Sequence, residues 1–319
     1  MARHCWIRCL VMLGRQLQGL GDKDGFILVA VLWILAALAA LASVFAIYIA
    51  NTAAAARLYD DRLQVRTLVI AGVELTAYRL LGLDDAHRPT SGAFGVQIGR
   101  SRVDVAFQSE GARIDLNLAP KELLSGLFSV LGAAPEDAGA YADRIIAWRT
   151  KPPSGAQNTG LQSAAAQSAD AEAYRAAGLA YGPRQAPFQN VLELHLIRCL
   201  PPELAEAVLP FVTIFNGRAE IDVNEAPAQV ISALPRISPS AVAEILKERD
   251  PRNPQIALQL VGAARGSVAA GGRRTTRAKV RVVLDTGRTV NADVVLLIID
   301  NGPDPYRILA WHDDFDGPI

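Results

Sequence analysis

The side chains of this sequence that could bind a ligand are mainly carboxylates. Five aspartates gather near the C-terminal end, at Asp300, Asp304, Asp313, Asp314 and Asp316. A smaller pair, Asp170 and Glu172, lies in the middle of the chain. Calcium takes about six to eight oxygen ligands, many of them from carboxylates, so Asp170, Glu172, Asp300 and Asp304 are candidate metal ligands. A solvated acidic tail is the alternative for the C-terminal group.

Groups typical of catalysis or of structural metal sites are few. The 4 histidines are scattered, and of the 3 cysteines Cys5 and Cys9 lie close to the start. A structural zinc site needs four closely spaced ligands. The motifs of serine hydrolases, zinc proteases and phosphate-binding loops do not occur in the sequence. We therefore expect a protein that is not an enzyme and has no disulfide framework.

The composition sets the scale of the fold. The chain has 319 residues, 51% of them hydrophobic, and its 32 Lys and Arg balance its 32 Asp and Glu. That length is enough for about two domains with sizeable cores. A net charge of zero argues against binding nucleic acid by bulk electrostatics, so no nucleic-acid partner is expected.

One segment is apolar enough to cross a membrane. Residues Phe26–Ala50 contain no charged side chain, and about 20 apolar residues in a helix span the hydrocarbon of a bilayer. Four basic residues precede the segment, against Asp22 and Asp24, and this excess predicts a cytoplasmic N-terminus with the body outside. The alternatives are a buried helix of a soluble protein and a cleaved secretory signal, whose apolar region is shorter.

The helix is expected to continue beyond the membrane. After Ala56 apolar and charged residues alternate at helical spacing as far as Gly82, and Pro89 then breaks the pattern. The sequence thus predicts one helix from Phe26 to Gly82.

Two groups of strands flank the middle of the chain. Arg102–Phe107 and Ala112–Leu116 are predicted to form a hairpin across a Ser-Glu-Gly turn. Ala278–Leu284 and Val290–Ile299 form a second predicted hairpin, and Tyr306–Trp311 a further strand. Since a lone hairpin is marginally stable, we expect both groups to join the long helix in one α+β domain, interrupted by a large insertion.

The insertion contains a repeat. Residues 112–127 and 219–234 are identical at 8 of 16 positions. The shared motif comprises Ile114, Asp115, Asn117 and Pro120 in the first copy and Ile221, Asp222, Asn224 and Pro227 in the second. Each proline is expected at the first position of a helix. A second helix should follow in each copy, at Pro135–Trp148 and Ser238–Arg249.

The junction before the apolar segment resembles a processing site. Lys23-Asp24-Gly25 is followed at once by Phe26 and the apolar run, which resembles the prepilin leader of type IV pilins and type II secretion pseudopilins. The resemblance implies that a membrane aspartyl peptidase, the prepilin peptidase, cuts after Gly25 and methylates Phe26.

The fifth residue after that junction departs from the family pattern. Subunits of the filament shaft carry Glu there, which pairs with the free amine of a neighbouring subunit, and here the residue is Ala30. A buried ammonium needs such a partner. The substitution therefore favours a subunit at the tip, with no other subunit ahead of it.

The order of motifs along the chain resembles one family. After the leader and helix come Ile114-Asp-Leu-Asn-Leu-Ala119, Tyr181-Gly-Pro, Ala186-Pro-Phe188, Glu193-Leu194 and Ile221-Asp-Val-Asn-Glu-Ala226. This order is similar to that of the K-type minor pseudopilins of type II secretion. The family implies a pilin-like α+β fold, in which a long N-terminal helix packs on a small antiparallel sheet and a large all-α insertion carries the repeated helix pair.

The resemblance also implies boundaries and partners. It divides the chain into a leader (1–25), a transmembrane spine helix (26–83), a pilin-like part (84–118 and 273–319) and a helical insertion (119–272). It implies a protein of the bacterial inner membrane with a periplasmic body, at the tip of the pseudopilus. Its partners would be the I-type and J-type minor pseudopilins, the other pseudopilins, the prepilin peptidase and membrane lipid.

Calcium is implied by the resemblance, but one expected position is altered. Family members commonly have acidic residues after the Trp that closes the first helix pair, whereas this chain has Trp148-Arg-Thr-Lys151. Two positive charges replace the ligands there, so no calcium site is assigned near residue 150.

A membrane-anchored DNA-binding protein of an uptake system is the main alternative. The repeated units also resemble helix-hairpin-helix modules, whose Gly-apolar-Gly turns let backbone N–H groups approach phosphate. The corresponding turns here, Leu131-Gly-Ala-Ala134 and Pro235-Arg-Ile-Ser238, lack the glycine pair. A basic cluster, which could bind nucleic acid or anionic lipid, comprises Arg265, Arg273, Arg274, Arg277, Lys279 and Arg281. The alternation at 277–281 instead favours the solvated face of an edge strand.

Overall fold

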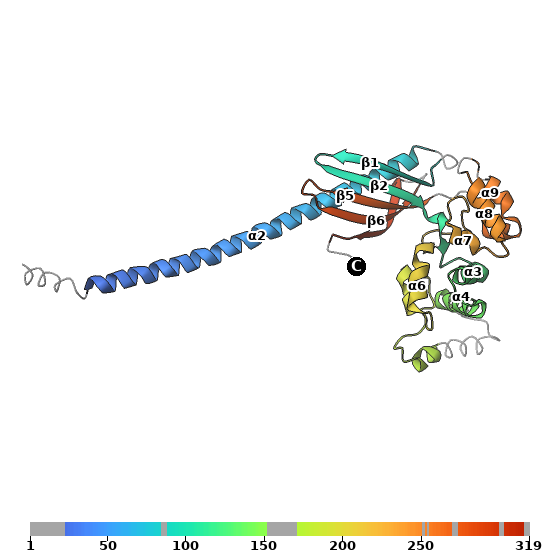
Figure 1. Cartoon of the computed structure of the whole chain (residues 1–319), viewed down its shortest axis with the longest axis horizontal. Coiled ribbons are helices and arrows are strands. Elements are labelled where there is room, and N and C mark those ends of the chain that lie inside the picture. Colours follow the sequence, from blue (N-terminus) through green and yellow to red (C-terminus); the bar gives the residue numbers. More distant parts are fainter. Residues whose placement is uncertain are drawn as a thin grey trace, which may run out of the picture. The chain divides into compact units, whose positions relative to one another are not determined.

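The computed structural model describes residues 23–83, 88–151, 171–250, 253, 255–269, 274–299 and 303–315, with side chains from Phe26 onward. These residues form two compact units, one ending at Gln64 and one beginning at Val65. Labels follow Figure 1, in which the long helix, the strands and the helices of the insertion can be traced along the chain.

The long predicted helix is present. Helix α2 spans Lys23–Leu81, 59 residues, close to the predicted bounds. Its part up to Gln64 is exposed almost throughout, and its apolar window has a mean hydropathy of 2.8, long enough to cross a membrane. The helix ends where Gly82 donates to the Tyr78 carbonyl and Arg88 Nε caps the Leu80 carbonyl at 2.9 Å.

The second part of α2 packs on a sheet. Val65, Val69 and Val73 lie on the same face and are buried in one core with the inward side chains of the strands, as expected for residues spaced by about one helical turn. Gly72 permits this close approach, because a Cβ at that position would lie 3.1 Å from a Val280 methyl group and 3.2 Å from Val103 and Val105.

The sheet has five antiparallel strands. Their spatial order is β1 (Ser91–Ile98), β2 (Ser101–Ser109), β5 (Thr275–Val283), β6 (Thr289–Ile298) and β7 (Tyr306–Asp313). The predicted pairing of the β5 and β6 segments is confirmed, and so is the further strand at β7. Figure 1 shows how strands from both ends of the sequence lie side by side.

The predicted hairpin between 102–107 and 112–116 is wrong. Strand β2 pairs with β1 through a turn at Gly99 (φ 60°) and with β5 on its other side. Ser109 accepts a hydrogen bond from Gly111 N and opens a short 3-10 helix, η1 (Glu110–Ala112), which leads the chain out of the sheet. Residues Ile114–Asp115 (β3) instead pair in parallel with Val212–Thr213 (β4).

The expectation of an edge strand for Arg277, Lys279 and Arg281 is also wrong. They lie on β5, the middle strand of the five. Two carboxylates are their direct cross-strand neighbours, since Lys279 faces Asp293 on β6 and Arg281 faces Asp104 on β2. Opposite charges across a strand pair are stabilising, and they allow basic residues in a central strand.

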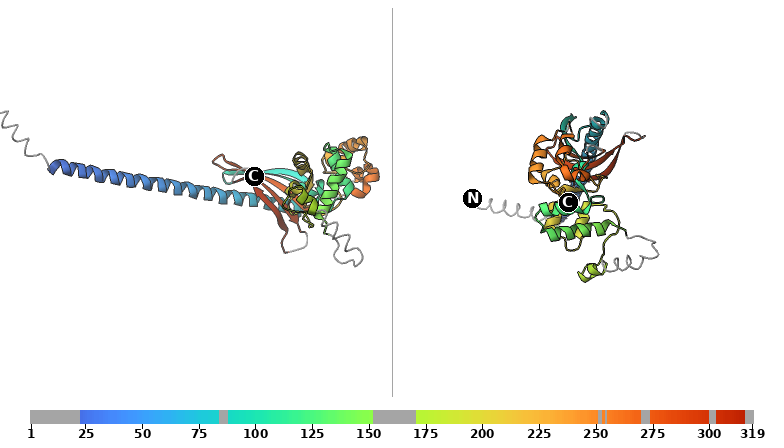
Figure 2. Two further views of the ribbon diagram at one scale, coloured as in Figure 1. Left: turned by 90° about the horizontal axis from the view of Figure 1, so that it is seen from below. Right: turned by 90° about the vertical axis from the view of Figure 1, so that its right-hand side faces the viewer.

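Short helices build the insertion. They are α3 (Lys121–Val130), α4 (Pro135–Arg149), η2 (Val191–Leu196), α6 (Pro202–Val208), η3 (Leu209–Phe211), α7 (Ala228–Ser232), α8 (Pro239–Glu248), α9 (Gln255–Leu260) and η4 (Gly262–Ser267). Helices α4 and α8 match the two predicted second helices. In both views of Figure 2 the helices of the insertion cluster together, and they enclose an apolar core of their own.

Candidate functional site

The two repeat copies share one backbone turn. In the first, Asp115 Oδ1 accepts from Asn117 N at 2.8 Å, and Ala119 N donates to the Asp115 carbonyl at 2.8 Å. In the second, Asp222 Oδ1 accepts from Asn224 N at 3.0 Å, and the Ala226 N–H makes the equivalent bond at 2.9 Å. The aspartate thus folds the chain back, because short polar side chains mimic a backbone turn.

The motif prolines lie just outside the helices. Pro120 is the N-cap of α3 (φ −70°) and Pro227 is the N-cap of α7 (φ −65°). The prediction had each proline as the first residue of its helix, whereas in the structure each proline directly precedes that residue. Their ψ angles of 160° and 159° are extended, so the backbone becomes helical only at the next residue.

The shared asparagine has different partners in the two copies. Asn117 binds the backbone of Phe188 twice, with Oδ1 accepting from the Phe188 N–H at 2.7 Å and Nδ2 donating to its carbonyl at 3.1 Å. Asn224 Nδ2 donates to Asp222 Oδ1 at 3.2 Å. Its Oδ1 is buried and has no hydrogen-bond partner among the described residues. Only the first copy therefore anchors a distant segment through this residue.

An arginine at the end of each second helix completes the repeat. Arg149 donates to the carbonyls of Leu116 (2.5 Å) and Ala119 (2.7 Å). Arg249 donates to the carbonyl of Ala226 at 2.8 Å, the position equivalent to Ala119. Burial lowers the pKa of Arg149, and the charge of Asp115 partly offsets this. The sequence comparison missed these arginines because the spacing between motif and arginine differs between the copies.

This role of Arg149 bears on the calcium expectation. The position where the family commonly has acidic residues holds a guanidinium already bound to two carbonyl groups, and such a site repels a cation. Glu172 and Asp304 are exposed, while Asp170 and Asp300 lie outside the described residues. Within the described part of the chain, no group of three or more His, Cys, Asp or Glu could hold a metal ion.

Residues singled out by the family motifs gather around Trp148. Its ring lies 6.4 Å from Tyr174 and 6.3 Å from Phe188, centroid to centroid. Its Nε1 donates to Glu193 Oε2 at 3.0 Å, and Arg184 donates to Glu193 Oε1 at 2.6 Å. These residues hold the segment before η2 on α4, so the motif residues serve the architecture of the insertion.

The turns of the two helix pairs each contain one residue of positive φ. Gly132 (φ 99°) takes this conformation between α3 and α4, and the exposed Arg236 (φ 60°) takes it between α7 and α8. Ser238, beside it, uses its hydroxyl to cap α8 by accepting from Ala241 N at 3.2 Å. The turn between α7 and α8 thus carries an arginine side chain at a position where a phosphate-binding turn would need glycine, so that the backbone could approach the phosphate.

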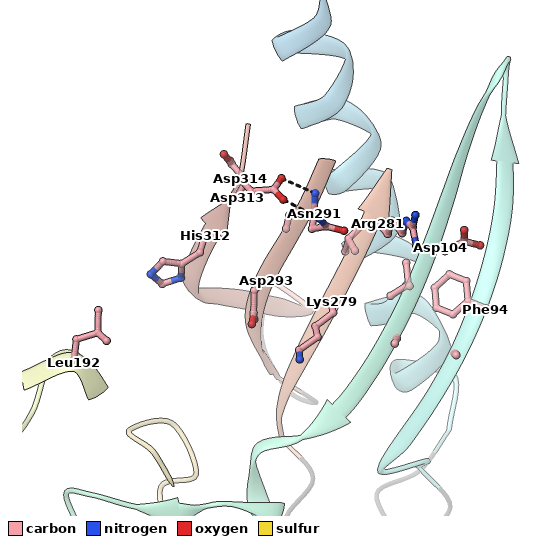
Figure 3. Close-up of a pocket in the computed structure, with 15 residues that line it drawn as sticks. Phe94, Asp104, Leu192, Lys279, Arg281, Asn291, Asp293, His312, Asp313 and Asp314 are labelled. Atoms are coloured by element: carbon pink, nitrogen blue, oxygen red, sulfur yellow. Dashed lines mark hydrogen bonds between the residues drawn. The ribbon is translucent and has the colours of Figure 1, made fainter. Parts of the chain in front are cut away.

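A cleft of about 900 Å³ lies over the outer face of the sheet. Figure 3 shows Lys279 and Asp293 in its middle, with His312 and Leu192 toward one side and Phe94 and Asp104 toward the other.

The cleft carboxylates have partners. Asp104 binds Arg102 Nε at 2.9 Å, a hydrogen bond that lowers the pKa of Asp104. Asp293 accepts from Arg277 Nη1 at 3.1 Å, and Asp314 Oδ1 accepts from Asn291 N at 2.7 Å. Each of these three carboxylates is thus engaged by a neighbouring hydrogen-bond donor.

The predicted processing residues lie at the start of α2. Gly25, Phe26 and Ala30 all fall within Lys23–Leu81, and the Phe26 side chain is 75% exposed. All three residues thus lie within the first compact unit.

Comparison with known proteins gives two findings. The family model for type II secretion system (T2SS) protein K matches residues 108–217, from the end of β2 through the first repeat copy to just beyond β4. The fold is similar to a chain of the crystal structure of the GspK–GspI–GspJ complex from the enterotoxigenic Escherichia coli type II secretion system. The TM-score is 0.54 at 13% identity, over 79% of this chain and 98% of that chain.

No curated protein sequence matches the chain. At 13% identity the structural likeness shows the fold alone, whereas the family model is matched by the segment that holds the Asp-x-Asn turn, the Trp148 cluster and Glu193. The likeness to protein K of the type II secretion system therefore lies in that segment of the sequence and in the fold.

Proposed function

We propose that this protein is a minor pseudopilin that caps the tip of the periplasmic pseudopilus of type II secretion and helps to start its assembly. The observation that carries the proposal is the protein K segment at 108–217 within a chain that has a membrane-length apolar helix near its N-terminus. The role is mechanical and uses packing surfaces, not a catalytic group.

The same proposal assigns the parts of the chain. The leader 1–25 would be removed, leaving Phe26 as the methylated first residue in the inner membrane and the body in the periplasm. Residues 84–118 and 273–319 would form the pilin-like part, with the insertion at 119–272. The solved relative is a complex of GspK with GspI and GspJ, which supports the I-type and J-type minor pseudopilins as partners.

A tip position also follows from Ala30. In lipid, a free amine is costly unless a carboxylate faces it. Ala30 offers no carboxylate, so this subunit would not neutralise the amine of a subunit placed ahead of it. The bulk of the insertion agrees with the same position, because a shaft subunit is enclosed by its neighbours.

N-terminal processing is the first test. The intact mass and N-terminal sequence of the protein would be determined from membranes of cells with and without the prepilin peptidase. A chain that begins at methylated Phe26 only when the peptidase is present supports the pseudopilin class. A chain that keeps its leader in both would contradict the proposal and indicate an ordinary signal anchor. Co-purification with the I-type and J-type subunits then tests the tip assignment.

A further inference from the structure

The second compact unit contains two apolar cores joined by a polar contact. The core between α2 and the sheet and the core of the insertion have no residue in common. The chain passes from sheet to insertion after Ser109 and returns to the sheet at Thr275. Apolar burial therefore stabilises each core separately, and the angle between them depends on what lies at the crossings.

Glu110 lies at the first crossing, and its side chain is 1% exposed. Its Oε1 accepts from Arg277 Nε of β5 at 2.5 Å, and Oε2 accepts from the hydroxyl of Thr213 in β4. One carboxylate thus binds a strand of the sheet and a strand of the insertion at the same time. We call Glu110, Arg277, Asp293 and Thr213 the polar seam.

Arg277 extends the seam across the sheet. Its Nη1 donates to both carboxylate oxygens of Asp293 on β6, at 3.1 and 3.2 Å. Burial lowers the pKa of Arg277, but Glu110 and Asp293 outweigh it, so its net pKa is raised. A planar guanidinium held by two carboxylates from different elements has little rotational freedom.

Two further bonds cross the same boundary. The Asp222 N–H of the second repeat copy donates to the Gly111 carbonyl at 2.8 Å, and the Thr90 hydroxyl donates to Glu225. The motif of the second copy is thereby tied to residues that flank β1 and β2.

We propose that the polar seam is a latch that holds the insertion at one fixed angle to the sheet. Hydrophobic contact has no preferred direction. The charged hydrogen bonds of the polar seam, in contrast, fix both the orientation and the separation of the residues that they join. The inference goes beyond the proposed function and does not depend on it. With the latch closed, a force applied to the insertion is transmitted to α2 without bending at the two crossings.

The test measures the angle directly. In the full chain purified in detergent, Cys5, Cys9 and Cys199 are replaced by serine, and spin labels are attached at Arg100→Cys on the β1–β2 turn and Asp137→Cys on α4. Pulsed electron resonance then reports the distance distribution between the sheet and the insertion. The double variant Glu110→Gln with Arg277→Gln removes both charges, so that neither is left buried alone. We expect it to lose the single narrow distance while amide exchange remains slow in both cores.

The matched control is Arg102→Gln with Asp104→Asn. It removes an exposed ion pair on β2 and should leave the distance unchanged. A narrow, unshifted distance in the seam variant would overturn the proposal, and so would a joint loss of amide protection in both cores. If the double variant fails to fold, Glu110→Asp provides the test, because it keeps the negative charge but shortens the side chain by one methylene group. The proposal then requires a broader distribution of spin-label distances in Glu110→Asp than in the unaltered chain.

Discussion

At the scale of single residues, the turn of the second helix pair stores strain. Arg236 holds φ at 60° on an exposed turn, a conformation that costs a non-glycine residue about 1–2 kcal/mol. Glycine would avoid this cost but lose about 0.5–1 kcal/mol through its greater freedom in the unfolded chain. We therefore expect Arg236→Gly to raise the free energy of unfolding by about 0.5–1 kcal/mol, measured by urea denaturation of the detergent-purified chain.

The first copy supplies the control. Gly132 takes φ 99° at the corresponding turn, and a Cβ there would meet no other atom within 4 Å. Gly132→Ala should therefore lose about 0.5–1 kcal/mol, because the backbone strain of about 1–2 kcal/mol outweighs the 0.5–1 kcal/mol gained by restricting the unfolded chain. If Arg236→Gly and Gly132→Ala changed the free energy of unfolding in the same direction, backbone strain would not be the cause of the changes.

Asp115 predicts how stability depends on pH. Burial raises the pKa of this carboxyl above its ordinary value of 3.8, and the N–H groups of Gly217 and Asn117 and the charge of Arg149 oppose the shift only in part. Between the ordinary and the raised pKa the native state binds more protons than the unfolded state. The contribution of Asp115 to stability therefore falls as pH rises through that interval and is constant above it.

Comparison with Asp115→Asn isolates this effect, since the amide does not titrate. The free energy of unfolding of the wild type minus that of the variant should decrease from about pH 3 upward and then level off. Denaturant titrations at several pH values would measure it. A difference that grows with pH would mean that the bonds from Gly217, Asn117 and Arg149 outweigh burial.

At the scale of elements, α3 and α7 touch through a glycine. A Cβ on Gly126 would collide with the backbone carbonyl of Ala233 at the end of α7. Backbone cannot move aside as a flexible side chain can, so Gly126→Ala should destabilise the insertion by about 1–3 kcal/mol. Thermal unfolding followed by circular dichroism would measure this loss.

Gly139 is the matched control on the next helix. It is half-buried within α4, and a Cβ there meets nothing within 4 Å. Gly139→Ala should stabilise by about 0.5–1 kcal/mol, because alanine favours the helix. If both substitutions stabilised the protein, the close contact between α3 and α7 would be contradicted.

The elements also show what the sequence could predict. Helix α2, the pairing of β5 with β6 and the repeat were predictable because each has a strong local pattern. Strand β1 was not, because its Ser-Gly-Ala-Phe-Gly segment lacks regular alternation. Because β1 was missing from the prediction, β2 was paired with residues 112–116, and β5 was expected at an edge of the sheet. Arg149 and Arg249 were missed because their spacing from the motif differs between the copies, and because the carbonyl groups that they bind leave no signal in side-chain identity.

At the scale of the whole molecule, the apolar helix and the insertion have separate parts in the proposed assembly of the pseudopilus. The family motif residues Asp115, Asn117, Trp148 and Glu193 hold together the insertion and the segment that enters it. The apolar helix and the residue at its fifth proposed mature position would then decide where the subunit stands in a filament. A change of that one residue should alter the position of the subunit and leave its body intact.

Ala30→Glu tests this separation. A carboxylate at position 30 could neutralise the amine of a subunit ahead of it, which would admit this chain into the shaft. We expect fewer pseudopili to be initiated and less exoprotein to be exported, with unchanged co-purification of the I-type and J-type subunits. Ala30→Gln is the control, since it has nearly the same size and no charge. If Ala30→Glu initiated pseudopili at the normal rate, the missing carboxylate would not define the tip, and the insertion would be left as the feature that excludes the subunit from the shaft.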